Sequence, residues 1–130
     1  MTVIEMESHR ILLAGAWASL VLIYLLGDVI RIFAGHADPG NIGGQEVASW
    51  VWTLASAIML LPIAMILVSL MVPATPLRWI EIIVSIALVI FNLAGIASYP
   101  GFYDKMLLVT SFAVNGIIVW IAWAWQPASA

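Results

Sequence analysis

Residues 45–72 read QEVASWVWTLASAIMLLPIAMILVSLMV, an apolar run in which Glu46 is the one charged residue. A helix that crosses the hydrocarbon core of a bilayer needs about 20 predominantly apolar residues, and this run is long enough. Glu46 falls in the first turn, where a carboxylate suits the positive end of the helix dipole. Pro62 lies inside the run and predicts a kink, because proline supplies no backbone N–H. The run therefore predicts one membrane-spanning helix.

Three further apolar runs predict three more spanning helices, at residues 10–34, 77–98 and 104–126. Glycine-rich residues 35–44 predict a water-exposed loop, and the other two connections are tight turns. Short turns place successive helices side by side in opposite directions. We therefore expect an all-α membrane protein: an antiparallel four-transmembrane-helix bundle, one domain over residues 1–130, with both termini on the same side.

Composition supports this fold and excludes several functions. Hydrophobic residues make up 65% of the chain and charged residues 8%, against roughly 45–50% and about 25% in soluble domains. A net charge of −3 without a cluster of Lys or Arg lacks the electrostatic footprint of a nucleic-acid binder or a polybasic lipid anchor. The absence of cysteine excludes disulfides, thiolate metal sites and cysteine nucleophiles.

Polar residues inside the spans carry most of the information about function, because a polar group in hydrocarbon needs a partner or a role. At about 1.5 Å of helical rise per residue, one residue from each helix falls roughly 9–12 Å below the loop-side surface. These four are Asp28, Thr53, Asn92 and Ser111. The terminal-side half contains few polar side chains besides Ser19 and Ser85. We therefore expect a buried polar layer, open toward the loop side, with Asp28 as its ionisable centre.

Other polar and aromatic residues fall near this layer, on the same helix faces. Asn115 lies one turn deeper than Ser111, and Trp50 could wall a pocket. The predicted ligand-binding set consists of Tyr24, Asp28, Arg31, Glu46, Ser49, Trp50, Thr53, Asn92, Ser111 and Asn115.

Structural explanations for some of these residues stay open. Asp28 could pair with Arg31 and anchor the helix end. Asn92 and Asn115 could be interhelical hydrogen-bond partners without a ligand. Glu81 lies three residues after Arg78, and we expect the two to form a local ion pair at the membrane interface.

An enzymatic function is disfavoured by the absence of an intramembrane histidine, a nucleophile beside a base or a nucleotide loop. His36 with Asp38 is too small a set to hold a metal. We therefore expect no catalytic residue, no metal and no cofactor.

Four short motifs run through the chain: Tyr24-Leu-Leu-Gly-Asp28, Leu61-Pro-Ile-Ala-Met-Ile66, Arg78-Trp79 and Trp123-Ala-Trp125. Together they resemble a family of small four-helix bacterial membrane proteins known only as a domain of unknown function. The resemblance implies four helices in a bacterial inner (cytoplasmic) membrane and implies no activity.

The distribution of Lys and Arg bears on orientation. Arg10 and Arg78 fall on the terminal side, whereas Arg31 and Lys105 fall on the loop side. Asp28, three residues before Arg31, can neutralise it, so the positive-inside rule slightly favours cytoplasmic termini.

Three functions compete. The first is a non-enzymatic protein that binds or transports a small solute or cation through the polar layer. The second is an accessory or structural membrane subunit whose polar layer only holds helices together. The third is a protein that binds a lipid or another amphiphile through a pocket opening sideways between helices. Four helices enclose little volume, so we expect a homo-oligomer or a partner membrane protein, with membrane lipids around it.

Overall fold

The computed structural model describes residues 3–42, 44–99 and 101–126. Its elements are α1 (Val3–Phe33), β1 (Asn41–Ile42), β2 (Gln45–Glu46), α2 (Ser49–Met71), α3 (Ala74–Gly95), the one-turn 3₁₀ helix η1 (Ile96–Ser98) and α4 (Phe102–Ala124).

The four long helices are each long and apolar enough to cross a membrane. The spans are Glu7–Phe33, Ser49–Met71, Ala74–Ser98 and Phe102–Ala124. Many of their large apolar side chains face outward, as expected where lipid rather than water surrounds a fold. The prediction of four helices that are each long and apolar enough to span a membrane is therefore confirmed.

The helix limits differ from prediction at all four starts, and α4 begins at Phe102 rather than at residue 104. α1 begins at Val3, before the predicted residue 10, and α3 begins at Ala74 rather than at residue 77. α2 begins at Ser49 rather than at residue 45, because Gln45 and Glu46 pair with the strand before them.

A small hairpin occupies the predicted loop between α1 and α2. β1 pairs antiparallel with β2, with Asn41 opposite Glu46 and Ile42 opposite Gln45. Gly40 and Gly44 have φ of 84° and 80°, a left-handed conformation that side chains disfavour. The glycines in the predicted loop therefore also allow the backbone to form this hairpin.

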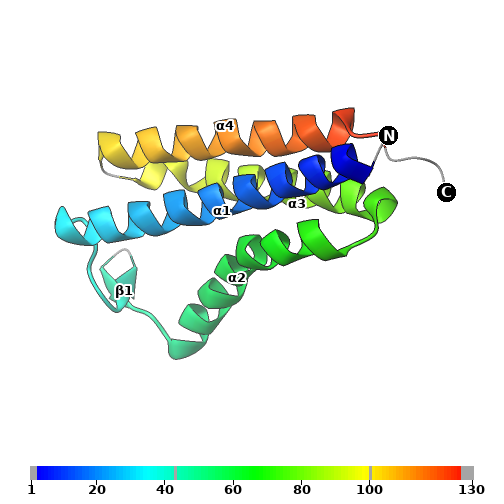
Figure 1. Ribbon diagram of the computed structural model, residues 1–130. Coiled ribbons are helices and arrows are strands. Elements are labelled where there is room, and N and C mark those ends of the chain that lie inside the picture. Colours follow the sequence, from blue (N-terminus) through cyan, green and yellow to red (C-terminus); the bar gives the residue numbers. More distant parts are fainter. Residues whose placement is uncertain (1–2, 43, 100, 127–130) are drawn as a thin grey trace.

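The helices do not pack equally. α1 packs against both α2 and α4, and α3 packs against α4, whereas α2 has few contacts with α3. Figure 1 shows α1, α3 and α4 running alongside one another, while α2 changes direction part-way and its first half points away from them. Pro62 lies inside α2, and its missing N–H explains a bend there.

The core lies in the half of the bundle where α1 begins and α4 ends, which we call the terminal end. Its fully buried side chains include Leu13, Trp17, Leu20, Leu77, Ile118 and Trp125. The opposite end, where the hairpin and η1 lie, is called the loop end. Trp125, near the end of the chain, is 0% exposed and its ring stacks on His9.

Two arginines tie helix ends together at the terminal end. Arg10 of α1 donates from Nη1 to the carbonyl oxygens of Ser69 (3.1 Å) and Val72 (2.7 Å), at the end of α2. Arg78 of α3 donates to the carbonyl oxygens of Ala122 (2.9 Å) and Trp123 (2.8 Å), at the end of α4. The last carbonyls of a helix lack partners within it, and these guanidinium groups supply them.

Candidate functional site

A cluster of charged side chains lies at the loop end, with Arg31 at its centre. Arg31 Nη1 contacts Asp28 Oδ1 at 3.0 Å, and Arg31 Nη2 contacts Asp104 Oδ1 at 2.9 Å. The Asp104 side chain is 2% exposed, whereas that of Asp28 is 56% exposed. Asp104 also lies in the first turn of α4, where a carboxylate is favoured by the helix dipole. The buried member of the cluster is therefore Asp104, which joins α1 to α4.

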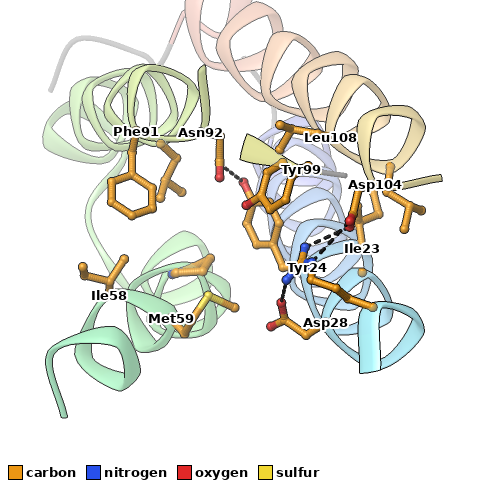
Figure 2. A pocket seen from close by; sticks show the side chains of 15 residues that line it. Ile23, Tyr24, Asp28, Ile58, Met59, Phe91, Asn92, Tyr99, Asp104 and Leu108 are labelled. Carbon is orange, nitrogen blue, oxygen red and sulfur yellow. Dashed lines mark hydrogen bonds and ion pairs between the residues drawn. The ribbon is translucent and has the colours of Figure 1, made fainter. Parts of the chain in front are cut away.

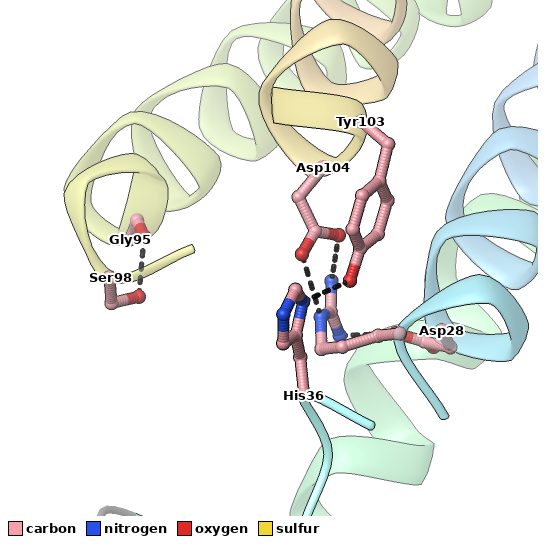
Figure 3. Close-up of polar contacts among 7 residues, drawn as sticks. Asp28, His36, Gly95, Ser98, Tyr103 and Asp104 are labelled. Atoms are coloured by element: carbon pink, nitrogen blue, oxygen red, sulfur yellow. Dashed lines mark hydrogen bonds and ion pairs between the residues drawn. The ribbon is translucent and has the colours of Figure 1, made fainter. Parts of the chain in front are cut away.

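Aromatic rings cover this cluster. The guanidinium carbon of Arg31 lies 4.7 Å from the centre of the Tyr99 ring, within the range of a cation–π contact. His36 Nδ1 lies 2.7 Å from the Tyr103 hydroxyl, and the two rings stack with centres 5.7 Å apart. Figure 3 shows this pair beside the carboxylate of Asp104. The loop after α1 is thereby joined to the start of α4.

Deeper along the bundle, Tyr24 of α1 accepts a hydrogen bond from Asn92 of α3. The distance from Asn92 Nδ2 to the Tyr24 hydroxyl oxygen is 3.1 Å. Both side chains are partly buried, and Figure 2 shows the bond crossing the space between the two helices.

These polar groups form one wall of a pocket of about 130 Å³ to which all four helices contribute. Tyr24, Asp28, Arg31, Asn92, Tyr99 and Asp104 supply its polar groups. Ile58, Met59 and Pro62 of α2, together with Phe91 and Leu88 of α3, supply apolar surface. In Figure 2, Ile58 and Met59 stand across the pocket from the aspartates and tyrosines. The pocket is therefore amphipathic, with a polar wall that faces an apolar one.

The pocket is open at its edge. Phe91 is 58% exposed although it lines the pocket, and Figure 2 shows it on the same side as Ile58 with open space between them. In α2 none of residues 49–57 is buried. The first half of α2 therefore stands apart from α3, and the apolar wall meets the outer surface of the bundle there.

Four predicted site residues come together at this pocket: Tyr24, Asp28, Arg31 and Asn92. They belong to α1 and α3. The rest of the predicted set does not line this pocket.

Ser111 and Asn115 are buried and do not line the pocket, but they lie next to Tyr24, where α4 meets α3. Ser85 Oγ donates to Asn115 Oδ1 at 2.7 Å, and Asn115 Nδ2 donates to the Ser111 carbonyl oxygen at 3.0 Å. The Ser111 hydroxyl donates to the Leu108 carbonyl oxygen at 2.6 Å. The position of Asn115 therefore matches the interhelical role that the sequence left open.

The residues predicted from the second helix lie outside the pocket. Glu46, Ser49, Trp50 and Thr53 are all exposed. The Thr53 hydroxyl contacts the Ser49 carbonyl oxygen of its own helix at 3.4 Å. The prediction that Thr53 shares a layer with Asp28, Asn92 and Ser111 is therefore wrong, because depth was counted along a helix that leaves the bundle before this level.

Two carboxylates were placed wrongly or overlooked. Asp104 was not in the predicted set, although it shares a helix face with Ser111. Glu81 was expected to pair with Arg78, but Arg78 reaches the end of α4 instead and Glu81 is 0% exposed. Since α3 begins at Ala74, Glu81 lies about two turns into the helix rather than one. The expectation of a terminal half with few polar side chains is corrected accordingly.

In the part of the chain that the structure describes, no group of three or more His, Cys, Asp or Glu side chains could hold a metal ion. Comparisons with protein-family models, with curated proteins and with solved structures find no match for this chain. The resemblance to four-helix bacterial membrane proteins therefore stays a prediction.

Proposed function

We propose that this protein binds a small amphiphile with a cationic head group in the loop-end pocket, and that it carries out no chemistry there. The observation that supports this proposal most directly is the pairing of a polar wall with an apolar wall in one open pocket. An amphiphile presents the same two surfaces. This function joins the cation-binding and amphiphile-binding expectations from the sequence.

The charges at the polar wall favour a positive head group. Asp28 and Asp104 carry two negative charges against the one positive charge of Arg31. Asp104 is buried and already bound twice by Arg31. Asp28 is the exposed carboxylate, and it is positioned to contact a head group at the mouth of the pocket.

The apolar wall and the opening favour a ligand that approaches from the bilayer. Drug-sized ligands occupy pockets of roughly 300–1,000 Å³, and this pocket measures about 130 Å³. It holds a head group and the first methylene groups, while the remainder of the chain lies in lipid beside Phe91 and the first half of α2. Binding of part of a ligand also fits a bundle of only four helices.

The proposal includes a topology. We infer an antiparallel bundle with both termini on one side, because Arg10 near the start of α1 contacts the end of α2. Likewise, Arg78 near the start of α3 contacts the end of α4. The positive-inside rule with Asp28 beside Arg31 favours cytoplasmic termini, and the bacterial inner membrane is the expected location. The pocket then lies in the periplasmic leaflet.

Photolabelling tests this function in protein reconstituted in lipid nanodiscs. The probe is a dodecyl chain with a photoreactive diazirine and a trimethylammonium head group, and the competitors are unlabelled dodecyltrimethylammonium and dodecyl sulfate. We expect saturable labelling of peptides that contain Ile58, Met59 or Phe91, displaced by the ammonium and not by the sulfate.

Two matched variants identify the role of the carboxylate. We expect Asp28→Asn to lower saturable labelling at least several-fold. Asp38→Asn, which removes the same charge from the loop after α1, should leave labelling unchanged. Labelling that is spread evenly over the outer helix faces, or equal displacement by both head groups, would overturn the proposal.

An accessory subunit is the second candidate, and a separate observation favours it. Trp50, Trp52 and Leu54 on the first half of α2 are 66%, 42% and 51% exposed, and a partner helix could cover them. Under this reading Asp28 serves only to orient Arg31. Absence of saturable labelling, together with loss of the protein when it is expressed alone, would favour this candidate.

A further inference from the structure

Glu81 is a buried carboxyl group at the terminal end, away from the loop-end pocket. Its side chain is 0% exposed, and it lies where α1, α2 and α3 meet. Trp17 of α1 donates from Nε1 to Glu81 Oε2 at 2.5 Å. Ser69 of α2 places its hydroxyl oxygen 2.6 Å from Glu81 Oε1. Both carboxyl oxygens are thus engaged by neighbouring helices.

The two short contacts of the Ser69 hydroxyl fit a protonated Glu81. The hydroxyl oxygen of Ser69 lies 2.7 Å from the Met65 carbonyl oxygen as well as 2.6 Å from Glu81 Oε1. A serine hydroxyl has one hydrogen and can donate it to only one of two acceptors. A carbonyl oxygen cannot donate, so the second short contact is a hydrogen bond only when Glu81 Oε1 carries the hydrogen and Ser69 accepts it. The resulting chain runs from Glu81 through Ser69 to Met65.

No charged side chain among the described residues forms an ion pair with Glu81. The two ion pairs within 4.0 Å in the described part of the chain join Arg31 to Asp28 and to Asp104. Arg10 of α1 and Arg78 of α3 direct their guanidinium groups to backbone carbonyls at the ends of α2 and α4.

The other charged side chains that the structure describes on these helices lie elsewhere, and Asp28 and Arg31 of α1 lie at the loop end. Glu7 is exposed, and His9 stacks on Trp125. α2 contains no charged residue, and the charged residues of α4, Asp104 and Lys105, lie at the loop end. An unpaired carboxylate away from water is strongly disfavoured.

We propose that Glu81 is a proton-binding site, occupied at neutral pH and formed with Trp17 and Ser69. The protonated acid donates from Oε1 to Ser69 and accepts from Trp17 at Oε2, so every polar atom of the group is satisfied. Loss of the proton turns the Ser69 hydroxyl away from Met65 and leaves a negative charge in the contact between three helices. Proton release and the packing of these helices are therefore coupled.

Infrared spectroscopy of the whole protein in nanodiscs tests this proposal, since a protonated carboxyl group has a carbonyl stretching band distinct from those of a carboxylate. We expect this band in the wild type at neutral pH and its loss in Glu81→Gln. Asp104→Asn and Glu46→Gln, which alter an arginine-paired and an exposed carboxylate, should leave the band in place. A wild-type spectrum without the band at neutral pH, or a band that survives Glu81→Gln, would overturn the proposal.

A second variant covers the case in which Glu81→Gln does not fold. Ser69→Ala removes the acceptor of the proposed hydrogen bond and reduces the side-chain volume only slightly. We expect the carboxyl band to move to higher frequency, because a carbonyl band rises when its O–H loses a hydrogen-bond acceptor. An unmoved band in folded Ser69→Ala would refute the proposed chain.

Discussion

At the scale of single residues, the two aspartates around Arg31 play unequal parts. Asp104 is almost fully buried and receives hydrogen bonds from both Nε and Nη2 of Arg31, at 3.3 and 2.9 Å. Asp28 is exposed and receives one bond, from Nη1 at 3.0 Å. A guanidinium carries five N–H donors in a planar fork, which is how one side chain serves two carboxylates on different helices. Asp104 therefore stabilises the fold, while Asp28 remains accessible to a ligand.

This difference predicts unequal losses of stability. Removing one partner of a buried ion pair costs about 3–5 kcal/mol, and we reduce this to roughly 1–3 kcal/mol for Asp104→Asn because the Arg31 side chain is 24% exposed. Asp28→Asn breaks an exposed pair, which is worth about 0.2–1 kcal/mol. Unfolding of both variants and the wild type in the same detergent measures the difference. Equal destabilisation by the two variants would contradict this assignment.

The same residues show which parts of the site could be predicted from sequence. Tyr24, Asp28, Arg31 and Asn92 were predicted because polar side chains deep in an apolar run are conspicuous. Asp104 and Glu81 were not, because the sequence places both near predicted helix starts, where it does not reveal whether a carboxylate points inward. Arg31 and Asp104 are also far apart in the chain, and Arg31 had already been assigned to Asp28 three residues away.

At the scale of elements, α2 accounts for the main difference between the predicted and the observed site. Apolar runs of sufficient length correctly predicted four helices that are long and apolar enough to cross a membrane. Placing Thr53 in a shared layer further required α2 to stay beside its neighbours over its whole length. Without an N–H on Pro62, the carbonyl of Ile58 lacks its usual helical donor, and Ile58, Met59 and Pro62 all line the pocket. The bend that displaces Thr53 therefore also helps to form the apolar wall.

We predict that Pro62→Ala straightens α2 and narrows the pocket. The chain contains no cysteine, so spin labels can be introduced at exposed Thr53→Cys in α2 and Leu26→Cys in α1 for distance measurements. We expect the distance between labels to shift in Pro62→Ala, together with lower photolabelling by the dodecyl ammonium probe. Pro73→Ala, just before α3, serves as the control and should change neither. An unchanged distance would show that packing, and not Pro62, sets the direction of α2.

At the scale of the whole molecule, the two ends of the bundle are built differently. The terminal end contains the apolar core, the protonated Glu81 that we propose, and two arginines that hold helix ends. The loop end contains the open amphipathic pocket, whose wall on α2 is poorly supported by α3. The terminal end is therefore firmly packed and the loop end is open. This arrangement is expected if ligand binding moves the first half of α2 while the rest of the fold stays fixed.

The proposed topology places these two ends on opposite sides of the membrane, and single cysteines test it. Asp38→Cys lies in the exposed connection between α1 and α2, whereas Ser8→Cys lies at the exposed terminal end of α1. In bacterial cells whose outer membrane has been permeabilised and whose inner membrane is intact, we expect a membrane-impermeant maleimide to label Asp38→Cys. Ser8→Cys should react only after the inner membrane is also opened. Arg10 and Arg78 lie at the terminal end, whereas at the loop end Asp28 offsets Arg31 and leaves Lys105, so the positive-inside rule slightly favours cytoplasmic termini. The reverse pattern would place the pocket in the cytoplasmic leaflet and its ligand inside the cell. Labelling of both cysteines while the inner membrane is intact would mean that the loop end and the terminal end do not lie on opposite sides of that membrane. The antiparallel spanning arrangement would then be wrong.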